Sequence, residues 1–286
     1  MKKSRANIFA VLTGFFIALG RFLWVQNKNI VTRKVTHESS KIPASFDGFK
    51  ITQVSDYHNT YFGPKGKDLL QAVKKTHPDI ILVTGDLIDR RTPKEKRGIE
   101  MLASLMEIAP CYYVTGNHEA FYKDFEGIYE KILNTGVNNA SMNDFFISRD
   151  NDTIEITGIH DLRIFGDEET NPNIYNEYDA MLHERLNHVG KHFTILLAHR
   201  PEQFPRYSKY SVDLIFSGHA HGGQIRLPIV KGLYAPDQGV LPKFTEGIHT
   251  KNNSTLIISR GLGNSRFPWR VFNRPEIVSV TLKAKQ

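Results

Sequence analysis

The sequence predicts an α/β fold, because short apolar strands alternate with amphipathic helical segments from residue 49 onward. Strands are expected at residues 51–54, 80–84 and 112–115, with helices at residues 67–75 and 96–108 between them. Residues 80–83 are continuously apolar, which is typical of a strand covered on both faces. This β-α-β-α-β order implies a largely parallel sheet with right-handed crossovers.

The second half of the chain is richer in strands. They are expected at residues 154–157, 194–198, 214–216, 255–259 and 277–282, with a helix at residues 176–187. No internal repeat or low-complexity segment interrupts this region. We therefore expect a second sheet within one folded domain, spanning residues 48–286.

Composition excludes several classes of protein. Of the 286 residues, 40% are hydrophobic and 23% are charged, which is ordinary for a soluble globular domain and not for a disordered, fibrous or polytopic membrane protein. The single cysteine, Cys111, excludes an intrachain disulfide and a four-cysteine zinc site.

The formal net charge of +7 comes from the N-terminal segment. Residues 1–37 contain seven of the 37 Lys and Arg and no Asp or Glu, which leaves 30 cations against 30 acids in the rest of the chain. A balanced body argues against nucleic acid as a partner. The sequence gives no indication of oligomeric state.

The N-terminus combines cations with an apolar run. Residues 8–25 are apolar apart from Arg21, short for a membrane span, and we interpret residues 1–25 as an uncleaved anchor. The alternatives are a cleaved signal peptide and a packed or interfacial helix. Residues 26–47 are polar and are interpreted as a linker. Cations flank the run on both sides, but three come first, so we expect the folded domain on the extracytoplasmic face.

Ligand-type side chains follow five of the predicted strands. They are Asp56 and His58, then Asp86, then Asn117 and His118, then His199, and finally His219 and His221. The carboxyl ends of parallel strands share one edge of a sheet, so these groups should converge in space. Each is weak evidence alone, but five such strand ends together are hard to explain structurally, since burying unpaired polar groups is costly.

Carboxylate, imidazole and amide groups in this combination suit a site for two divalent metal ions. Mn, Fe and Zn accept such mixed ligands, whereas an all-oxygen set would favour Mg or Ca. Two adjacent ions need a bridging carboxylate; they activate water and clamp phosphate oxygens.

The motifs Asp-x-His, Gly-Asp, Gly-Asn-His-Glu, a lone His and Gly-His-x-His occur here in the order that resembles the calcineurin-like metallophosphoesterase family. The resemblance covers residues 49–282. The apolar N-terminus, Gly222-Gly223-Gln224 and the tail segments at residues 260–263 and 274–276 are similar to the bacterial membrane-associated phosphodiesterase branch. The resemblance to the family implies a four-layer α/β/β/α sandwich with two mixed sheets.

The resemblance also implies a role for each ligand-type residue. The first metal would be held by Asp56, His58 and His221, and the second by Asn117, His199 and His219. Asp86 would bridge both. His118 would bind no metal and would act as general acid and transition-state stabiliser.

The function implied is hydrolysis of a phosphodiester or pyrophosphate by attack of a metal-bridged hydroxide. The anchor extends this to a lipid-linked or envelope phosphoester substrate. Alternatives are a non-catalytic scaffold with the same fold, and a nuclease or phosphoprotein phosphatase of the same family.

Two further features each allow two interpretations. Arg200 follows a predicted ligand and is either an ordinary surface arginine or a phosphate contact. A basic and aromatic stretch is either a substrate or head-group contact or a solvated loop. It comprises Arg260, Arg266, Phe267, Trp269, Arg270, Phe272 and Arg274.

Overall fold

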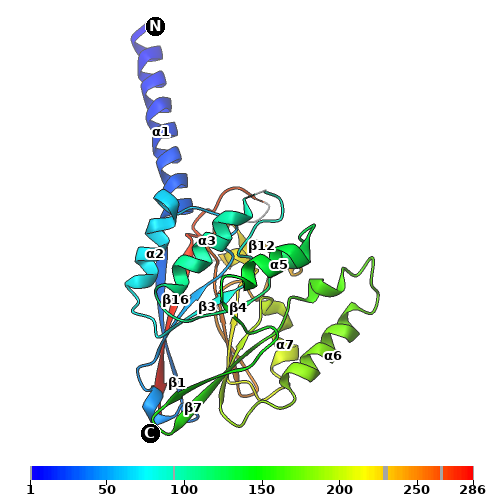
Figure 1. The fold of residues 1–286 in the computed structure, drawn as a ribbon. Helices are drawn as coiled ribbons and strands as arrows, with labels where there is room; N and C mark the ends of the chain where they lie inside the picture. Colours follow the sequence, from blue (N-terminus) through cyan, green and yellow to red (C-terminus); the bar gives the residue numbers. More distant parts are fainter. Residues whose placement is uncertain (1, 93, 228–230, 265–266, 286) are drawn as a thin grey trace.

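The fold, taken from a computed structural model that describes residues 2–92, 94–227, 231–264 and 267–285, has four layers. Two six-stranded mixed sheets pack face to face, and helices cover the outer face of each (Figure 1). This confirms the expected α/β/β/α sandwich.

The first sheet is formed mainly by the first half of the chain. Its order is β1 (Val31–Ser39), β16 (Glu276–Ala284), β2 (Lys50–Val54), β3 (Ile80–Thr84), β4 (Cys111–Val114) and β5 (Asn138–Asn139). The β16–β2 pair is antiparallel and the other pairs are parallel. The predicted β-α-β-α-β unit is therefore confirmed, and the C-terminal strand joins it.

The second sheet is formed by the second half. Its order is β14 (Gly247–Lys251), β15 (Ser254–Ile258), β9 (Leu214–Ser217), β8 (Phe193–Leu197), β7 (Asp152–Gly158) and β6 (Phe145–Arg149). The two outer pairs are antiparallel and the inner ones parallel. Two short hairpins lie outside both sheets. They are β10 (Arg226–Leu227) with β11 (Lys231–Gly232), and β12 (Tyr234–Ala235) with β13 (Gly239–Val240).

Three apolar layers hold the sandwich together. Side chains such as Ile51, Leu82 and Ile195 fill the space between the sheets. A second layer lies under the helices of the first sheet, and a third under those of the second sheet. These helices are α2 (Lys67–Lys74), α3 (Glu95–Met106) and α5 (Phe125–Leu133), then α6 (Ile174–Leu186) and α7 (Phe204–Tyr207), with the one-turn α4 (Asn117–Ala120) beside the site. Strands buried on both faces explain the continuously apolar runs in the sequence.

Helix α1 (Lys2–Lys28) stands away from the body (Figure 1). Its segment Asn7–Lys28 contains an 18-residue window with a mean hydropathy of 2.0, and none of that window is buried in the protein. By length and composition it is able to cross a membrane, which supports membrane association of the chain.

The interpretation of residues 26–47 as a linker is wrong for most of that segment. Residues 26–28 complete α1, and β1 pairs in parallel with β16 over nine residues, from Val31 with Glu276 to Ser39 with Ala284. The sequence pattern of this segment does not indicate a strand, because β1 is an edge strand and none of its residues is fully buried. Polar residues therefore outnumber the apolar Val31 and Val35.

The pairing of β1 predicts that substitutions at two adjacent positions lower the free energy of unfolding by different amounts. Val35 packs against the core between the sheets, whereas Thr36 is exposed. Val35→Asp should lower the free energy of unfolding by about 1–3 kcal/mol, because it places a carboxylate against apolar side chains. The matched control, Thr36→Asp, should cost less than about 0.5 kcal/mol. Denaturant titration of both variants is the measurement, and equal costs would mean that this segment is not part of the sheet.

Candidate metal centre

The candidate site lies where the carboxyl ends of strands from both sheets meet. Strands β2, β3 and β4 supply residues from one sheet, and β8 and β9 from the other. Hydrogen bonds join the sheets directly at this edge: the Gln53 side-chain amide donates to the Ser217 carbonyl at 2.9 Å, and His199 Nδ1 lies 2.7 Å from the Thr84 carbonyl oxygen. Residues far apart in sequence are thereby brought to one place.

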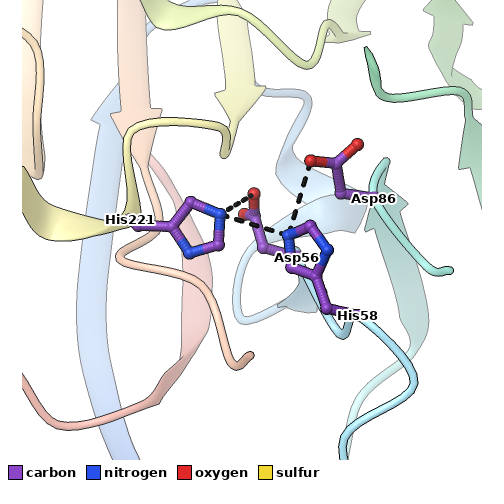
Figure 2. Close-up of side chains that lie close together, drawn as sticks. All are labelled: Asp56, His58, Asp86 and His221. Carbon is purple, nitrogen blue, oxygen red and sulfur yellow. Dashed lines mark hydrogen bonds and ion pairs between the residues drawn. The ribbon is translucent and has the colours of Figure 1, made fainter. Parts of the chain in front are cut away.

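Four of the predicted ligands form a first cluster, and Figure 2 shows their side chains directed toward one another. His221 Nε2 lies 3.2 Å from His58 Nε2 and 3.3 Å from Asp56 Oδ1. His58 Nε2 lies 3.5 Å from Asp86 Oδ2. All four residues are buried.

A second cluster shares Asp86 with the first. His199 Nε2 lies 3.4 Å from Asp86 Oδ2 and 3.3 Å from Asn117 Oδ1. His199, His219 and Asp86 offer ligand atoms that lie within 4.8 Å of one another. The structure therefore brings together all eight site residues predicted from the sequence, since His118 also lies against His58, with ring centroids 4.4 Å apart.

The backbone at these positions is strained. Five of the clustered residues have left-handed φ angles, between 46° and 64°, although none is glycine. They are Asp56, His58, Asp86, His219 and His221. Such conformations cost about 1–3 kcal/mol each and persist where the surrounding structure imposes them, commonly at functional sites. Gly85 has φ 89° and passes so close to Gly116 that a Cβ would lie 2.6 Å from its nitrogen, so no other residue fits there.

The arrangement of lone pairs fits metal ions. His199 Nδ1 donates to the Thr84 carbonyl, and its Nε2 faces two oxygen acceptors, Asp86 Oδ2 and Asn117 Oδ1. Such an arrangement requires positive charge on Nε2, which either a proton or a metal ion supplies. The buried Nδ1 of His219 has no hydrogen-bond partner among the described residues, while its Nε2 is held by Asp237 at 3.0 Å. A histidine held through one nitrogen is prepared to bind metal through the other.

The electrostatics point the same way. Burial and the neighbouring His118 lower the pKa of His58 to about 3, and burial lowers the pKa of His221 well below its usual value. Both imidazoles are thus neutral, as metal ligands must be. Burial raises the pKa of Asp56. Although burial opposes it, the Asp86 carboxylate raises the pKa of His199 to about 10, so this carboxylate attracts positive charge.

Glu119 is a structural determinant of the site that the sequence did not reveal. Its buried carboxylate accepts hydrogen bonds from three backbone N–H groups, those of Asp86 at 2.9 Å, Ile88 at 2.9 Å and Gly116 at 2.7 Å. Burial and the Asp86 charge raise its pKa to about 7. Glu119 therefore fixes the loop after β3 against the loop after β4.

Asp89 and His118 form a pair beside the first cluster. Asp89 Oδ1 lies 3.3 Å from His118 Nδ1, and the Asp89 carboxylate also accepts two hydrogen bonds from the Arg91 side chain. Burial lowers the pKa of His118, but the Asp86 and Asp89 carboxylates outweigh it and raise the pKa above its usual value. Asp89 lies three residues after Asp86, and only the observed turn brings its side chain to His118.

Arg200 is not an ordinary surface arginine, the first of the two alternatives that the sequence left open. It is buried and donates from Nε to Asp161 Oδ2 at 2.8 Å and from Nη1 to Asp237 Oδ2 at 2.5 Å. Asp237 in turn contacts His219, so Arg200 stabilises the residue that orients a candidate ligand. A pocket of about 230 Å³ opens beside these groups. Its lining includes Asn117, His118 and His219 together with Arg90, Arg91, Arg163 and Arg200.

The basic and aromatic stretch near the C-terminus is not a uniformly solvated loop. Arg270 is buried, and its guanidinium donates to the carbonyl oxygens of Arg260 and Gly263. It also lies 3.2 Å from His221 Nδ1. Arg266 lies outside the described residues. The stretch thus supports one candidate ligand from behind while its aromatic side chains remain exposed.

The fold and the site together define a class, the α/β/β/α proteins with a His/Asp metal site at the edge shared by two sheets. Comparison with known families agrees: residues 49–223 match the sequence model described as calcineurin-like phosphoesterase. The chain belongs to this family and is a metal-dependent phosphoester hydrolase.

Similar proteins include bacterial and vertebrate relatives. The metallophosphoesterase YkuE of Bacillus subtilis is 33% identical over 265 residues, which cover 89% of this chain and 86% of the relative. A transmembrane protein with metallophosphoesterase domain from Danio rerio is 27% identical, over 96% of this chain and 61% of its own length. The UDP-2,3-diacylglucosamine pyrophosphatase LpxG of Chlamydia trachomatis is 26% identical, over 85% and 87%.

The Glu119 contacts predict that an isosteric substitution is destabilising. In Glu119→Gln, the side-chain NH₂ would face a backbone N–H donor, and the lost acceptor should lower the free energy of unfolding by about 1–3 kcal/mol. Glu107→Gln, the same change at an exposed position, is the control and should be nearly neutral. Denaturant titration compares the two variants, and a neutral Glu119→Gln would contradict the role assigned to this carboxylate.

Proposed function

We propose that this protein is a dinuclear metal-dependent phosphodiesterase or pyrophosphatase held at a membrane by α1. The observation that carries the proposal is the sharing of Asp86 between two clusters of candidate ligands, with His58 at 3.5 Å and His199 at 3.4 Å from the same carboxylate oxygen. A carboxylate in this position suits a bridge between two divalent ions.

In this proposal the ligands divide between two metal positions. Asp56, His58 and His221 hold one ion, and Asn117, His199 and His219 hold the other, with Asp86 in contact with both. Bound ions supply activation of water and neutralisation of phosphate charge. Mn, Fe and Zn all suit this donor set, since it combines imidazole with carboxylate and amide oxygens.

The protein itself holds the reacting groups in place. The Asp86 carboxylate accepts from the His118 backbone N–H at 2.7 Å, which ties the bridging residue to the loop that presents His118. His118 lines the pocket, and its Nδ1 accepts from the Arg90 backbone N–H at 3.2 Å and lies 3.3 Å from Asp89 Oδ1. With the other nitrogen available to substrate, His118 suits donation of a proton to the leaving oxygen.

The pocket supports an anionic phosphoester substrate. Arg90, Arg91 and Arg163 line it beside the second cluster, and guanidinium groups suit phosphate oxygens. LpxG carries the name of a pyrophosphatase that acts on a diacylated nucleotide sugar. Together with α1, this likeness favours a substrate that is lipid-linked or part of the cell envelope. We place the catalytic domain on the extracytoplasmic face, since three cations precede the apolar segment of α1.

Substitution of the shared carboxylate tests the dinuclear centre. Asp86→Asn should reduce the metal content from about two ions per chain to one or fewer and lower the hydrolysis of an aryl phosphodiester with Mn by more than about 100-fold. Elemental analysis and the rate assay measure the two effects. Asp68→Asn, an exposed aspartate on α2, should change neither. Two retained ions with full activity in Asp86→Asn would contradict the bridge.

A second substitution separates proton transfer from metal binding. His118→Ala should lower the rate on the same substrate by about 10²–10⁴-fold while metal content stays unchanged. His183→Ala, an exposed histidine on α6, is the matched control. A substrate whose leaving group is a weak base should lose less rate than an alkyl ester, because it needs less protonation. An equal loss on both substrates would argue against the general-acid role.

A further inference from the structure

An apolar surface, which we call the apolar rim, lies at the end of the body from which α1 leaves. Its members are large apolar side chains from residues 227–241 and 267–272, and many are strongly exposed, for example Phe272 at 56%, Trp269 at 45% and Val240 at 76%. The apolar rim comprises Leu227, Tyr234, Val240, Leu241, Phe267, Trp269 and Phe272.

The segments that carry the rim are connected by backbone hydrogen bonds. Arg226 N donates to the Val271 carbonyl, Leu233 N to the Ile225 carbonyl and Leu241 N to the Leu233 carbonyl, each at 3.0 Å. These three bonds therefore join four neighbouring segments, and the bonded backbones lie about 5 Å apart. Exposed apolar side chains thus gather on adjacent segments, and such a gathering on a surface indicates an interaction site.

The rim is joined to the membrane-spanning candidate. The rings of Phe22 and Phe272 pack edge to face with centroids 5.4 Å apart. The Gln26 side chain accepts from Asn273 N at 3.1 Å, and the Asn27 side chain accepts from Arg270 N at 3.0 Å. Phe22 belongs to the apolar segment of α1, about 9 Å along the helix from its end at Lys28. A bilayer that surrounds Phe22 therefore also reaches Phe272.

The rim also borders the candidate active site. Tyr234 and Phe267 belong to the rim and line the pocket that contains His118 and His219. Arginines line the same pocket. An apolar border combined with a cationic interior matches a molecule that has acyl chains and a phosphorylated head.

We propose that the apolar rim rests in the interfacial layer of the bilayer that α1 crosses, and that the pocket receives its substrate directly from that bilayer. The substrate class is a membrane-resident amphiphile whose phosphoester head enters the pocket while its acyl chains stay in the membrane. The docking surface follows from α1 and the rim alone, whereas the substrate class rests on the proposed function. Aromatic side chains with an apolar body and a polar edge favour this layer.

The position of Trp269 tests the docking. The chain has two tryptophans, Trp24 and Trp269, so Trp24→Phe leaves Trp269 as the only tryptophan. The full-length variant is reconstituted in vesicles that contain lipids with a quencher near the head group or at the acyl chain end. We expect blue-shifted Trp269 emission that the head-group quencher suppresses more strongly. Emission typical of hydrated tryptophan with no quenching by either lipid would overturn the proposal. Trp269→Phe, which reports Trp24, verifies that α1 is inserted.

A rate comparison tests the delivery of substrate. Trp269→Ser and Phe272→Ser should lower the hydrolysis of a phosphodiester lipid embedded in vesicles by about tenfold and change the rate on a soluble aryl phosphodiester by less than about twofold. Phe146→Ser, an equally exposed phenylalanine on β6, should leave both rates unchanged. Equal rates of wild type and rim variants on the vesicle substrate would overturn the delivery route.

The two measurements separate this proposal from the proposed function. Wild-type protein that hydrolyses neither substrate while Trp269 is quenched would reject the proposed function and support the docking surface. Hydrolysis of the soluble substrate with an unquenched Trp269 would reject the docking surface and keep the phosphoesterase. Binding of a protein to the rim that excludes lipid from Trp269 would count against the bilayer as its partner.

Discussion

The geometry of the site depends on the buried carboxylate of Asp86. One of its oxygens lies within 3.5 Å of His58 from the first sheet and of His199 from the second. The other accepts from the backbone of His118, while the Asp86 main chain bonds to Glu119 and to His58 N. A buried charge with these neighbours is costly without compensation, and a divalent cation between the two sheets is the compensation that the donor set fits.

The packing of the fold holds the backbone in the strained conformations that this arrangement requires. Strands that lead to candidate ligands, such as β2 and β9, are buried on both faces. The chain must then turn sharply, so candidate ligands such as Asp56 and His219 adopt left-handed φ angles. Three apolar layers fix the strands before and the helices after these turns. The turns are therefore held by the packing of both sheets, which keeps the ligands close to one another.

The sequence predicted the residues of the candidate site more completely than the residues and strands that hold them in place. Strand ends converge by a general rule of parallel sheets, so Asp56, Asp86 and His199 could be grouped from local pattern alone. The supports depend on long-range contacts with no local signal: Arg200 is buried because Asp161 and Asp237 neutralise it. The sequence pattern did not predict strand β1 for a related reason. An edge strand with exposed faces carries polar residues, and only its partner β16 reveals it.

The junction between α1 and the body is a built contact and not a flexible tether. Gln26 and Asn27 at the end of α1 bond to the backbone of Asn273 and Arg270. The same two residues reach the candidate metal site, since Asn273 Nδ2 donates to the His221 carbonyl at 2.7 Å and the Arg270 guanidinium lies against His221 Nδ1. The chain of contacts from the apolar helix to a candidate ligand thus passes through two buried side chains. Because β1 follows α1 directly and pairs with β16, the helix is fixed to the body on both sides of its end. A helix held in this way would set the tilt of the pocket relative to a bilayer that it crossed, which a linker of free residues would leave undetermined.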